Sequence, residues 1–318
     1  MQIVFGHQNF CSMSLAIISP GRDVSAWIRH IQQADPNIQI QVYPEIKDKE
    51  TVDAVLLWKH PPGILSQFPN LKLVCSMGAG VDHILSDLSI PPHLPITRIV
   101  DDKLTFAMTN YVLMGVLNFH RQIFRYQKDQ QRKVWDMSNP ELPITVGVMG
   151  VGALGGDVMD KLAALRIPAV GYGNGPKACL PYPYFYGKDL DKFLSSINIL
   201  VCMLPLTEET ENILNLKLFR KCQKGTYLIN VARGNHLVEE DLLVAIKEGR
   251  ISGALLDVFR TEPLPEDHPF WTSAEITITP HIASVTNPEA AAPQIVENFH
   301  RMKRKEMLIH VIDRNKGY

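Results

Sequence analysis

Short apolar runs alternate along the chain with longer segments in which apolar residues recur every three or four positions. The short runs are typical of buried strands, and the longer period is typical of helices that cover a sheet. Before residue 100 we expect a helix around Trp27–Ile31 and strands at residues 3–5, 38–42, 54–58 and 73–75. Regular alternation of this kind predicts an α/β fold with a parallel sheet covered on both faces.

A second series of strands follows a break at the proline-rich residues 91–95. A long helix from residue 104 to about 131 comes first and is expected to bridge two domains. Six strands are then predicted, at residues 145–149, 169–172, 199–203, 227–231, 254–258 and 276–279. Six strands make a complete dinucleotide-binding sheet, so we expect the second unit to be doubly wound.

Composition agrees with two domains and narrows the class of partner. A chain of 318 residues, 46% of them hydrophobic, is long for a single core. Its net charge of −1 provides no global field to attract nucleic acid or anionic lipid, so a small-molecule partner fits better. We find no secretory signal and no apolar run of roughly 20 residues, and we therefore expect a soluble, cytoplasmic protein that does not bind membranes.

Five cysteines are spread along the chain without a CxxC pair. They are Cys11, Cys75, Cys179, Cys202 and Cys222. We expect structural thiols in a reducing compartment, with neither a disulfide nor a metal site.

A glycine-rich turn directly follows the predicted strand 145–149 and opens a predicted helix. Gly150 permits the tight turn, Gly152 lets the backbone approach a pyrophosphate, and Gly155 allows the helix to pack closely. The start of the helix then offers N–H donors and a positive dipole end to phosphate groups. In this context the GxGxxG pattern predicts a dinucleotide site rather than a purely structural turn.

The loop after the next strand bears on which dinucleotide is bound. An NAD enzyme would place a carboxylate there to bind the ribose hydroxyls. Residues 173–177 contain none, whereas Asn174 and Lys177 could bind a 2′-phosphate. The loop therefore favours NADP, with NAD as the second candidate; a mobile turn that selects neither is the alternative.

Three further segments begin where predicted strands end, and each carries one candidate catalytic side chain. They are residues 230–234 with Arg233, residues 256–264 with Glu262, and residues 279–283 with His281. The carboxyl ends of parallel strands face the ligand crevice of an open sheet, so the three side chains are expected to converge. Each taken singly has an ordinary structural explanation; together, downstream of a phosphate-binding loop, they indicate a catalytic set.

The three residue types fit the reduction of a 2-oxo acid. The planar guanidinium of Arg233 can engage adjacent carboxylate and carbonyl oxygens, which both binds the substrate and polarises the carbonyl. His281 can donate the proton, because an imidazole in general titrates near neutral pH, and Glu262 beside it would favour the imidazolium and hold its orientation.

These segments together resemble the D-isomer-specific 2-hydroxyacid dehydrogenase family over nearly the whole chain. The resemblance rests on the Gly150 loop and on residues 230–234, 257–264 and 279–281. Within the family the chain is most similar to the glyoxylate/hydroxypyruvate reductase A branch, through residues 77–85, 285–286 and 313–318. The resemblance therefore implies glyoxylate or hydroxypyruvate as the small 2-oxo acid.

The resemblance also implies a domain plan and further site residues. A Rossmann cofactor domain of residues 101–286 is inserted into a flavodoxin-like substrate domain of residues 1–100 and 287–318, with the active site in a cleft between them and a homodimer formed through the cofactor domains. The implied substrate contacts are Met77, Gly78, Ala79 and Gly80, besides Arg233 and His281. The implied cofactor contacts, beyond the glycines, are Ala153, Leu154, Leu204, Pro205, Thr207, Val231, Ala232 and Asp257.

Several alternatives stay open. Asp257 has a simpler role as a cap of the following turn, and Pro205 as the end of its strand. Trp58, Trp135 and Trp271 either narrow the substrate pocket or belong to the core. Other substrates of the same family, and a non-catalytic NAD(H)-sensing corepressor, are the competing functions.

Overall fold

The computed structural model describes residues 13–317, which form two compact units. Residues up to Asp101 and from Thr286 onward make up the first unit, and Asp102–Val285 make up the second. The predicted strand at residues 3–5 and Cys11 lie outside the described residues. Among the residues described, no helix combines the length and the apolarity needed to cross a bilayer.

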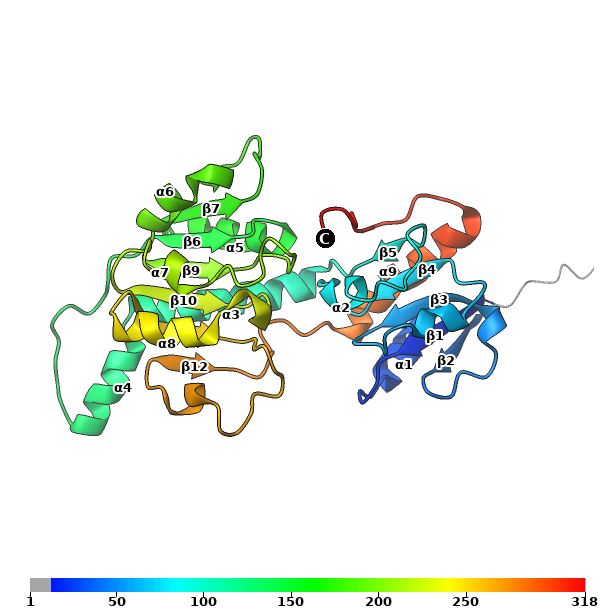
Figure 1. The fold of residues 1–318 in the computed structure, drawn as a ribbon, viewed down its shortest axis with the longest axis horizontal. Coiled ribbons are helices and arrows are strands. Elements are labelled where there is room, and N and C mark those ends of the chain that lie inside the picture. Colours follow the sequence, from blue (N-terminus) through cyan, green and yellow to red (C-terminus); the bar gives the residue numbers. More distant parts are fainter. Residues whose placement is uncertain (1–12, 318) are drawn as a thin grey trace, which may run out of the picture. The chain divides into compact units, whose positions relative to one another are not determined.

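The first unit is built on a five-stranded parallel sheet (Figure 1). Its strands are β1 (Met13–Ile18), β2 (Ile38–Val42), β3 (Val52–Leu57), β4 (Leu73–Ser76) and β5 (Ile96–Thr97). Their order is β2-β1-β3-β4-β5, which is the flavodoxin-like order. The doubly wound prediction is confirmed for this unit, although β1 and the two-residue β5 were not predicted.

Both faces of this sheet are buried. Leu15 and Ile17 of β1 pack with α1 (Ser25–Ala34) and α9 (Pro288–Arg304), whereas Ala16 and Ile18 join a cluster with α2 (Asp82–Leu85) on the other face. Because successive side chains of a strand point to opposite faces, residues Leu15–Ile18 of β1 are all apolar. Helix α9, from the end of the chain, lies against α1, where His300 Nε2 is 2.8 Å from Asp35 Oδ2.

The second unit contains a seven-stranded parallel sheet. Its strands are β6 (Val146–Met149), β7 (Ala169–Gly173), β8 (Tyr184–Tyr186), β9 (Ile199–Cys202), β10 (Thr226–Asn230), β11 (Ile251–Leu256) and β12 (Ile276–Ile278). They run in the order β8-β7-β6-β9-β10-β11-β12, so the direction of winding reverses between β6 and β9. This is the Rossmann order, with ligands expected at that switch point. The six predicted strands are confirmed, and β8 was missed.

Helices cover both faces of this sheet. Helices α3 (Asp102–His120) and α5 (Ala153–Ala164) pack on one face through the cluster that contains Val116 and Leu162. Helices α6 (Leu190–Ser195), α7 (Leu216–Phe219) and α8 (Glu239–Lys247) cover the other face through a second apolar cluster. Neighbouring residues of β9 and β10 alternate between the two clusters, as in other sheets that are buried on both sides.

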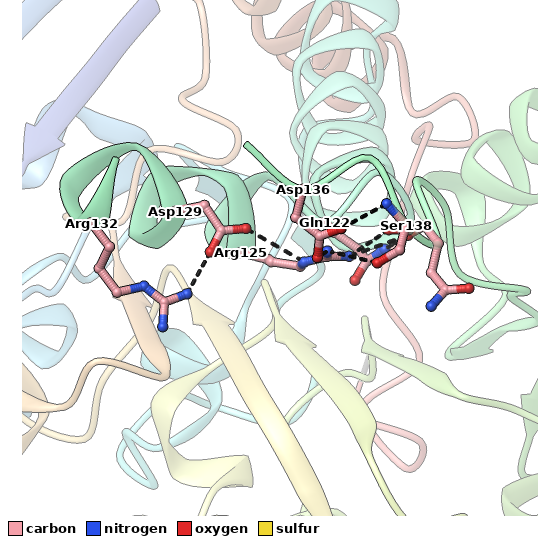
Figure 2. A network of polar contacts seen from close by, with 7 residues as sticks. Gln122, Arg125, Asp129, Arg132, Asp136 and Ser138 are labelled. Atoms are coloured by element: carbon pink, nitrogen blue, oxygen red, sulfur yellow. Dashed lines mark hydrogen bonds and ion pairs between the residues drawn. The ribbon is translucent and has the colours of Figure 1, made fainter. Parts of the chain in front are cut away.

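The prediction of one long helix from 104 to 131 is wrong, because α3 ends at His120 and α4 spans Ile123–Arg132. The chain turns at Gln122, whose φ of 54° is left-handed. Figure 2 shows the polar contacts that hold this corner: Gln122 donates to the Asn139 carbonyl, and Arg125 pairs with Asp129 and Asp136. Apolar periodicity cannot reveal such a break, because the contacts that stabilise it are polar and come from the following loop.

Three buried cysteines behave as structural thiols. Burial raises the pKa of Cys75 to about 11 and the pKa values of Cys202 and Cys222 to about 12. All three are free, and Cys75 and Cys202 lie within β4 and β9. Thiols protonated in this way are poor nucleophiles and poor metal ligands at neutral pH.

Candidate active site

Two glycines of the loop between β6 and α5 are required by the packing. Gly150 has a φ of +97°, and a Cβ there would lie 2.5 Å from the Met203 carbonyl oxygen. A Cβ on Gly155 would lie 2.1 Å from the Gly150 carbonyl oxygen. A side chain on Gly155 would therefore separate the helix from the end of β6, and one on Gly150 would push the turn away from the segment that follows β9.

Gly152 faces a different environment. It caps the N-terminus of α5, which has no side-chain cap and no acidic residue in its first turn, and an added Cβ would meet nothing within 4 Å. Backbone N–H groups at an uncapped helix start suit a phosphate group. These residues therefore fit the pyrophosphate of a dinucleotide, with Ala153 and Leu154 in the first turn of the helix.

The loop after β7 lies close to the glycine turn. The Lys177 ammonium donates to the carbonyl oxygen of Val151, so the structure brings this cation to the predicted phosphate-binding loop. Asn174 is exposed on the same loop. Tyr184 of β8 shapes the loop, since its hydroxyl donates to the Gly175 carbonyl at 3.1 Å and lies where a Cβ on Gly173 would be. Sequence reasoning missed Tyr184 because it missed its short strand.

The loop after β9 also lies against the glycine turn, because β9 and β6 are neighbours in the sheet. The Leu204 nitrogen lies 2.8 Å from where a Cβ on Gly150 would be. Within the loop, the Thr207 N–H donates to Thr210 Oγ1 at 2.8 Å, and that hydroxyl donates to the Pro205 carbonyl at 2.7 Å. Pro205 therefore does more than end a strand, since its carbonyl anchors a hydrogen-bonded loop.

Arg233 lies just beyond the end of β10, after the buried Val231 and Ala232. A Cβ on Gly234 would lie 1.9 Å from the Phe259 carbonyl carbon, so only glycine lets the Arg233 segment reach the loop that follows β11. Arg233 Nη1 donates to the Ala232 carbonyl at 2.7 Å. The segments carrying Arg233 and Glu262 are thus in direct backbone contact.

The structure brings Glu262 and His281 together as predicted. Nδ1 of His281 lies 2.9 Å from Glu262 Oε2 and 3.1 Å from Oε1, and the Phe259 N–H also donates to Oε1, at 3.2 Å. The side chains are 31% and 22% exposed, so the pair is accessible to a small molecule yet partly shielded from water. With Nδ1 engaged by the carboxylate, Nε2 is the ring nitrogen positioned to transfer a proton.

Asp257 holds the backbone around His281. Its buried carboxylate accepts hydrogen bonds from Thr279 Oγ1 at 2.6 Å and from the N–H groups of Ile282 and Ala283 at 2.8 Å each. Its carbonyl accepts from the His281 N–H at 2.9 Å. These contacts match the simpler alternative from the sequence, in which Asp257 caps the following turn, and they fix His281 at its left-handed φ of 55°.

Tyr111 of α3 extends this network, and no sequence motif indicated its role. Its hydroxyl is hydrogen-bonded to Thr279 Oγ1, which itself donates to Asp257. Burial and the charge of Asp257 raise the pKa of Tyr111 to about 12. The phenol is therefore neutral at physiological pH and donates to Thr279.

The predicted substrate loop belongs to the first unit and follows β4. Met77 and Gly78 are buried, and the Gly78 N–H donates to Ser76 Oγ at 3.1 Å. Since the Gly78 N–H is engaged within the loop, Ala79 and Gly80 are the stronger candidates as carboxylate donors. A Cβ on Gly78 would lie 3.1 Å from Trp58, which places this tryptophan beside the loop.

The other two tryptophans have other surroundings. Trp135 is 91% exposed, and Trp271 is 53% exposed with its Nε1 donating to the Pro265 carbonyl at 2.8 Å. Within the part of the chain that the structure describes, no three His, Cys, Asp or Glu side chains are grouped so that they could hold a metal ion.

Residues 113–283 match the NAD-binding domain of the D-isomer specific 2-hydroxyacid dehydrogenases, which is more than half of the chain. The chain belongs to this dehydrogenase family. The match covers the glycine turn and Arg233, Glu262 and His281, so the motifs that predicted the family lie inside it.

Relatives within the family are similar over nearly the full length. The glyoxylate/hydroxypyruvate reductase A of Photorhabdus laumondii is 38% identical over 96% of this chain and all of the relative. A D-isomer specific 2-hydroxyacid dehydrogenase from Xanthobacter autotrophicus, solved with NADPH and MES, has a TM-score of 0.92 at 36% identity, covering 96% of this chain and 100% of that one. An NADPH-dependent glyoxylate/hydroxypyruvate reductase from Sinorhizobium meliloti, solved with NADP and sulfate, has a TM-score of 0.90 at 32% identity with the same coverage.

Neighbouring glycines at the start of α5 provide a test of the packing. Gly155→Ala should lower the melting temperature by roughly 5–10 °C, because its Cβ meets backbone that cannot move aside. Gly156→Ala should raise it by about 2–4 °C, because that Cβ meets nothing and alanine favours the helix. Thermal unfolding of both variants measures the difference, and equal shifts would contradict this description of the loop.

Proposed function

We propose that the protein reduces short 2-oxo acids, glyoxylate and hydroxypyruvate in particular, to 2-hydroxy acids with NADPH. The observation that carries the proposal is the Glu262–His281 pair, 2.9 Å apart. Glu262 follows β11 and His281 follows β12, and β11 lies between β12 and β10, the strand that precedes Arg233. An acid–base pair and a guanidinium on neighbouring strand ends match what carbonyl reduction requires. The names of the similar reductases favour these two substrates.

The cofactor supplies the hydride when it is bound at the glycine turn. Arg233 binds the substrate carboxylate and polarises the carbonyl through its fork of N–H donors. His281 donates its Nε2 proton to the oxygen that becomes the hydroxyl, while Glu262 on Nδ1 stabilises the imidazolium and fixes the ring. For the loop after β4 in the first unit, the proposal keeps Met77, Gly78, Ala79 and Gly80 as the substrate contacts that the family resemblance implies.

Two features favour NADPH over NADH. The loop of residues 173–177 has no carboxylate to bind the ribose hydroxyls, and its Lys177 reaches the glycine turn. Three similar structures were solved with NADPH or NADP, including a probable 2-hydroxyacid dehydrogenase from Rhizobium etli. In this proposal Lys177 and Asn174 bind the 2′-phosphate, and the rest of the cofactor site is lined by Leu204, Pro205, Thr207, Val231 and Ala232.

Replacement of His281 tests the proton-donor role. His281→Gln should lower kcat for glyoxylate by about 10²- to 10⁴-fold, because the amide cannot transfer a proton. The Kd for NADPH, measured by fluorescence titration, should stay the same. Glu262→Gln keeps a hydrogen-bond partner for Nδ1 but loses the charge, so its loss of kcat should be smaller. Near wild-type kcat in His281→Gln would remove His281 from this role.

Replacement of Lys177 tests the cofactor preference. Lys177→Ala should lower kcat/KM for NADPH by about 10- to 100-fold, which corresponds to one charge-assisted hydrogen bond. The same constant for NADH should change less than about twofold, since NADH has no 2′-phosphate. An equal loss of kcat/KM with both cofactors would mean that Lys177 stabilises the loop and does not bind the 2′-phosphate.

We also propose a homodimer, formed through the segment after α4. Val134, Trp135 and Met137 are 47%, 91% and 78% exposed, and the contacts in Figure 2 hold the segment that carries them in place. Apolar side chains grouped on an ordered segment favour a protein partner. A double Trp135→Glu, Met137→Glu variant should sediment as a monomer, whereas Leu88→Glu, at an equally exposed position in the first unit, should not change the mass. A wild-type monomer at micromolar concentration would overturn the proposal.

A further inference from the structure

A fully buried histidine lies between two loops of the proposed site. His236 has 0% exposure and ends the short helix of residues Gly234–His236, directly after Arg233. Its Nδ1 lies 3.2 Å from the Arg233 main-chain nitrogen, and its Nε2 lies 3.2 Å from the Pro205 carbonyl oxygen. One imidazole thus touches the main chain of both the Arg233 segment and the loop after β9.

The surrounding donors and acceptors fix which ring nitrogen carries the proton. Nδ1 also lies 3.1 Å from the Arg233 carbonyl oxygen, but that oxygen already accepts from the His236 main-chain N–H at 3.2 Å and from Asn230 Nδ2 at 3.1 Å, which uses both of its lone pairs. The Arg233 N–H can only donate, so Nδ1 accepts from it. The Pro205 carbonyl can only accept, so Nε2 bears the proton and donates to it.

We propose that His236 is a positioning residue that sets the spacing between the substrate-binding Arg233 and the cofactor-binding loop at Leu204–Thr207. This inference rests on the proposed function of both segments. Without the imidazole, each loop loses one of its anchors: the N–H of Arg233 loses its hydrogen bond to Nδ1, and the Pro205 carbonyl loses the bond from Nε2 while it keeps the one from Thr210 at 2.7 Å. Because each ring nitrogen serves one loop, the two effects can be separated by substitution.

Two amides replace the two halves of the ring. His236→Asn places its amide oxygen near the position of Nδ1, so it preserves the acceptor for Arg233 and loses the donor to Pro205. His236→Gln places its amide nitrogen near the position of Nε2, so it preserves the donor to Pro205 and loses the acceptor for Arg233. His236→Leu loses both contacts.

Each variant should change one of two dissociation constants, that of NADPH or that of glyoxylate, more than the other. His236→Asn should raise the Kd of NADPH by about 3- to 10-fold and leave the Kd of glyoxylate, measured calorimetrically with unreactive NADP⁺ present, within about twofold. His236→Gln should raise the Kd of glyoxylate and leave the Kd of NADPH nearly unchanged, and His236→Leu should raise both constants. Thr210→Val removes the other anchor of Pro205 and should behave like His236→Asn.

A purely structural role predicts a different result. His60 is a second buried histidine, paired with Asp87 in the first unit at 3.1 Å. His60→Asn should lower the melting temperature without changing one of the two dissociation constants more than the other. Equal changes of both constants in His236→Asn and His236→Gln, or no change in either, would overturn the inference. Failure of the wild type to oxidise NADPH with any short 2-oxo acid would instead overturn the proposed function, while the binding constants would still test His236.

Discussion

The buried carboxylate of Asp257 holds the proposed active site together, because it joins the end of β11 to the segment that follows β12. Three donors converge on its two oxygens: the Thr279 hydroxyl and the consecutive backbone N–H groups of Ile282 and Ala283. A buried carboxylate without such donors would cost several kcal/mol, so the fold keeps the segment in place. His281 can therefore maintain a left-handed backbone, which costs about 1–3 kcal/mol in isolation, and present Nδ1 to Glu262.

Close backbone approaches provide the second constraint. Gly150, Gly155 and Gly234 each lie where a Cβ would overlap main-chain atoms of a neighbouring segment. Gly150 brings the turn to the segment after β9, Gly155 brings α5 to the end of β6, and Gly234 brings the Arg233 segment to the loop that carries Glu262. Parallel strands place these loops at one edge of the sheet, and the glycines bring them close enough to share hydrogen bonds through groups such as His236.

The sequence predicted those parts that repeat a pattern or begin at a strand end. Apolar runs located six of the seven strands of the second unit, and the Glu262–His281 pair followed from the strand-end rule. Tyr184 lies in a strand of three residues at the sheet edge, which has too few apolar positions to give a period. The turn at Gln122 and the role of His236 depend on partners that are distant in the sequence and meet only in the fold, so neither the apolar pattern nor any motif indicated them.

Transfer of a hydride from NADPH to C2 of a short 2-oxo acid can be followed with NADPH that carries deuterium at the transferred position of C4. Hydroxypyruvate serves as the substrate, and the product is analysed by mass spectrometry and chiral chromatography. We expect D-glycerate with one deuterium at C2, formed in equal amount to the NADPH consumed. Tight NADPH binding without deuterium in any product, across a panel of short 2-oxo acids, would contradict it.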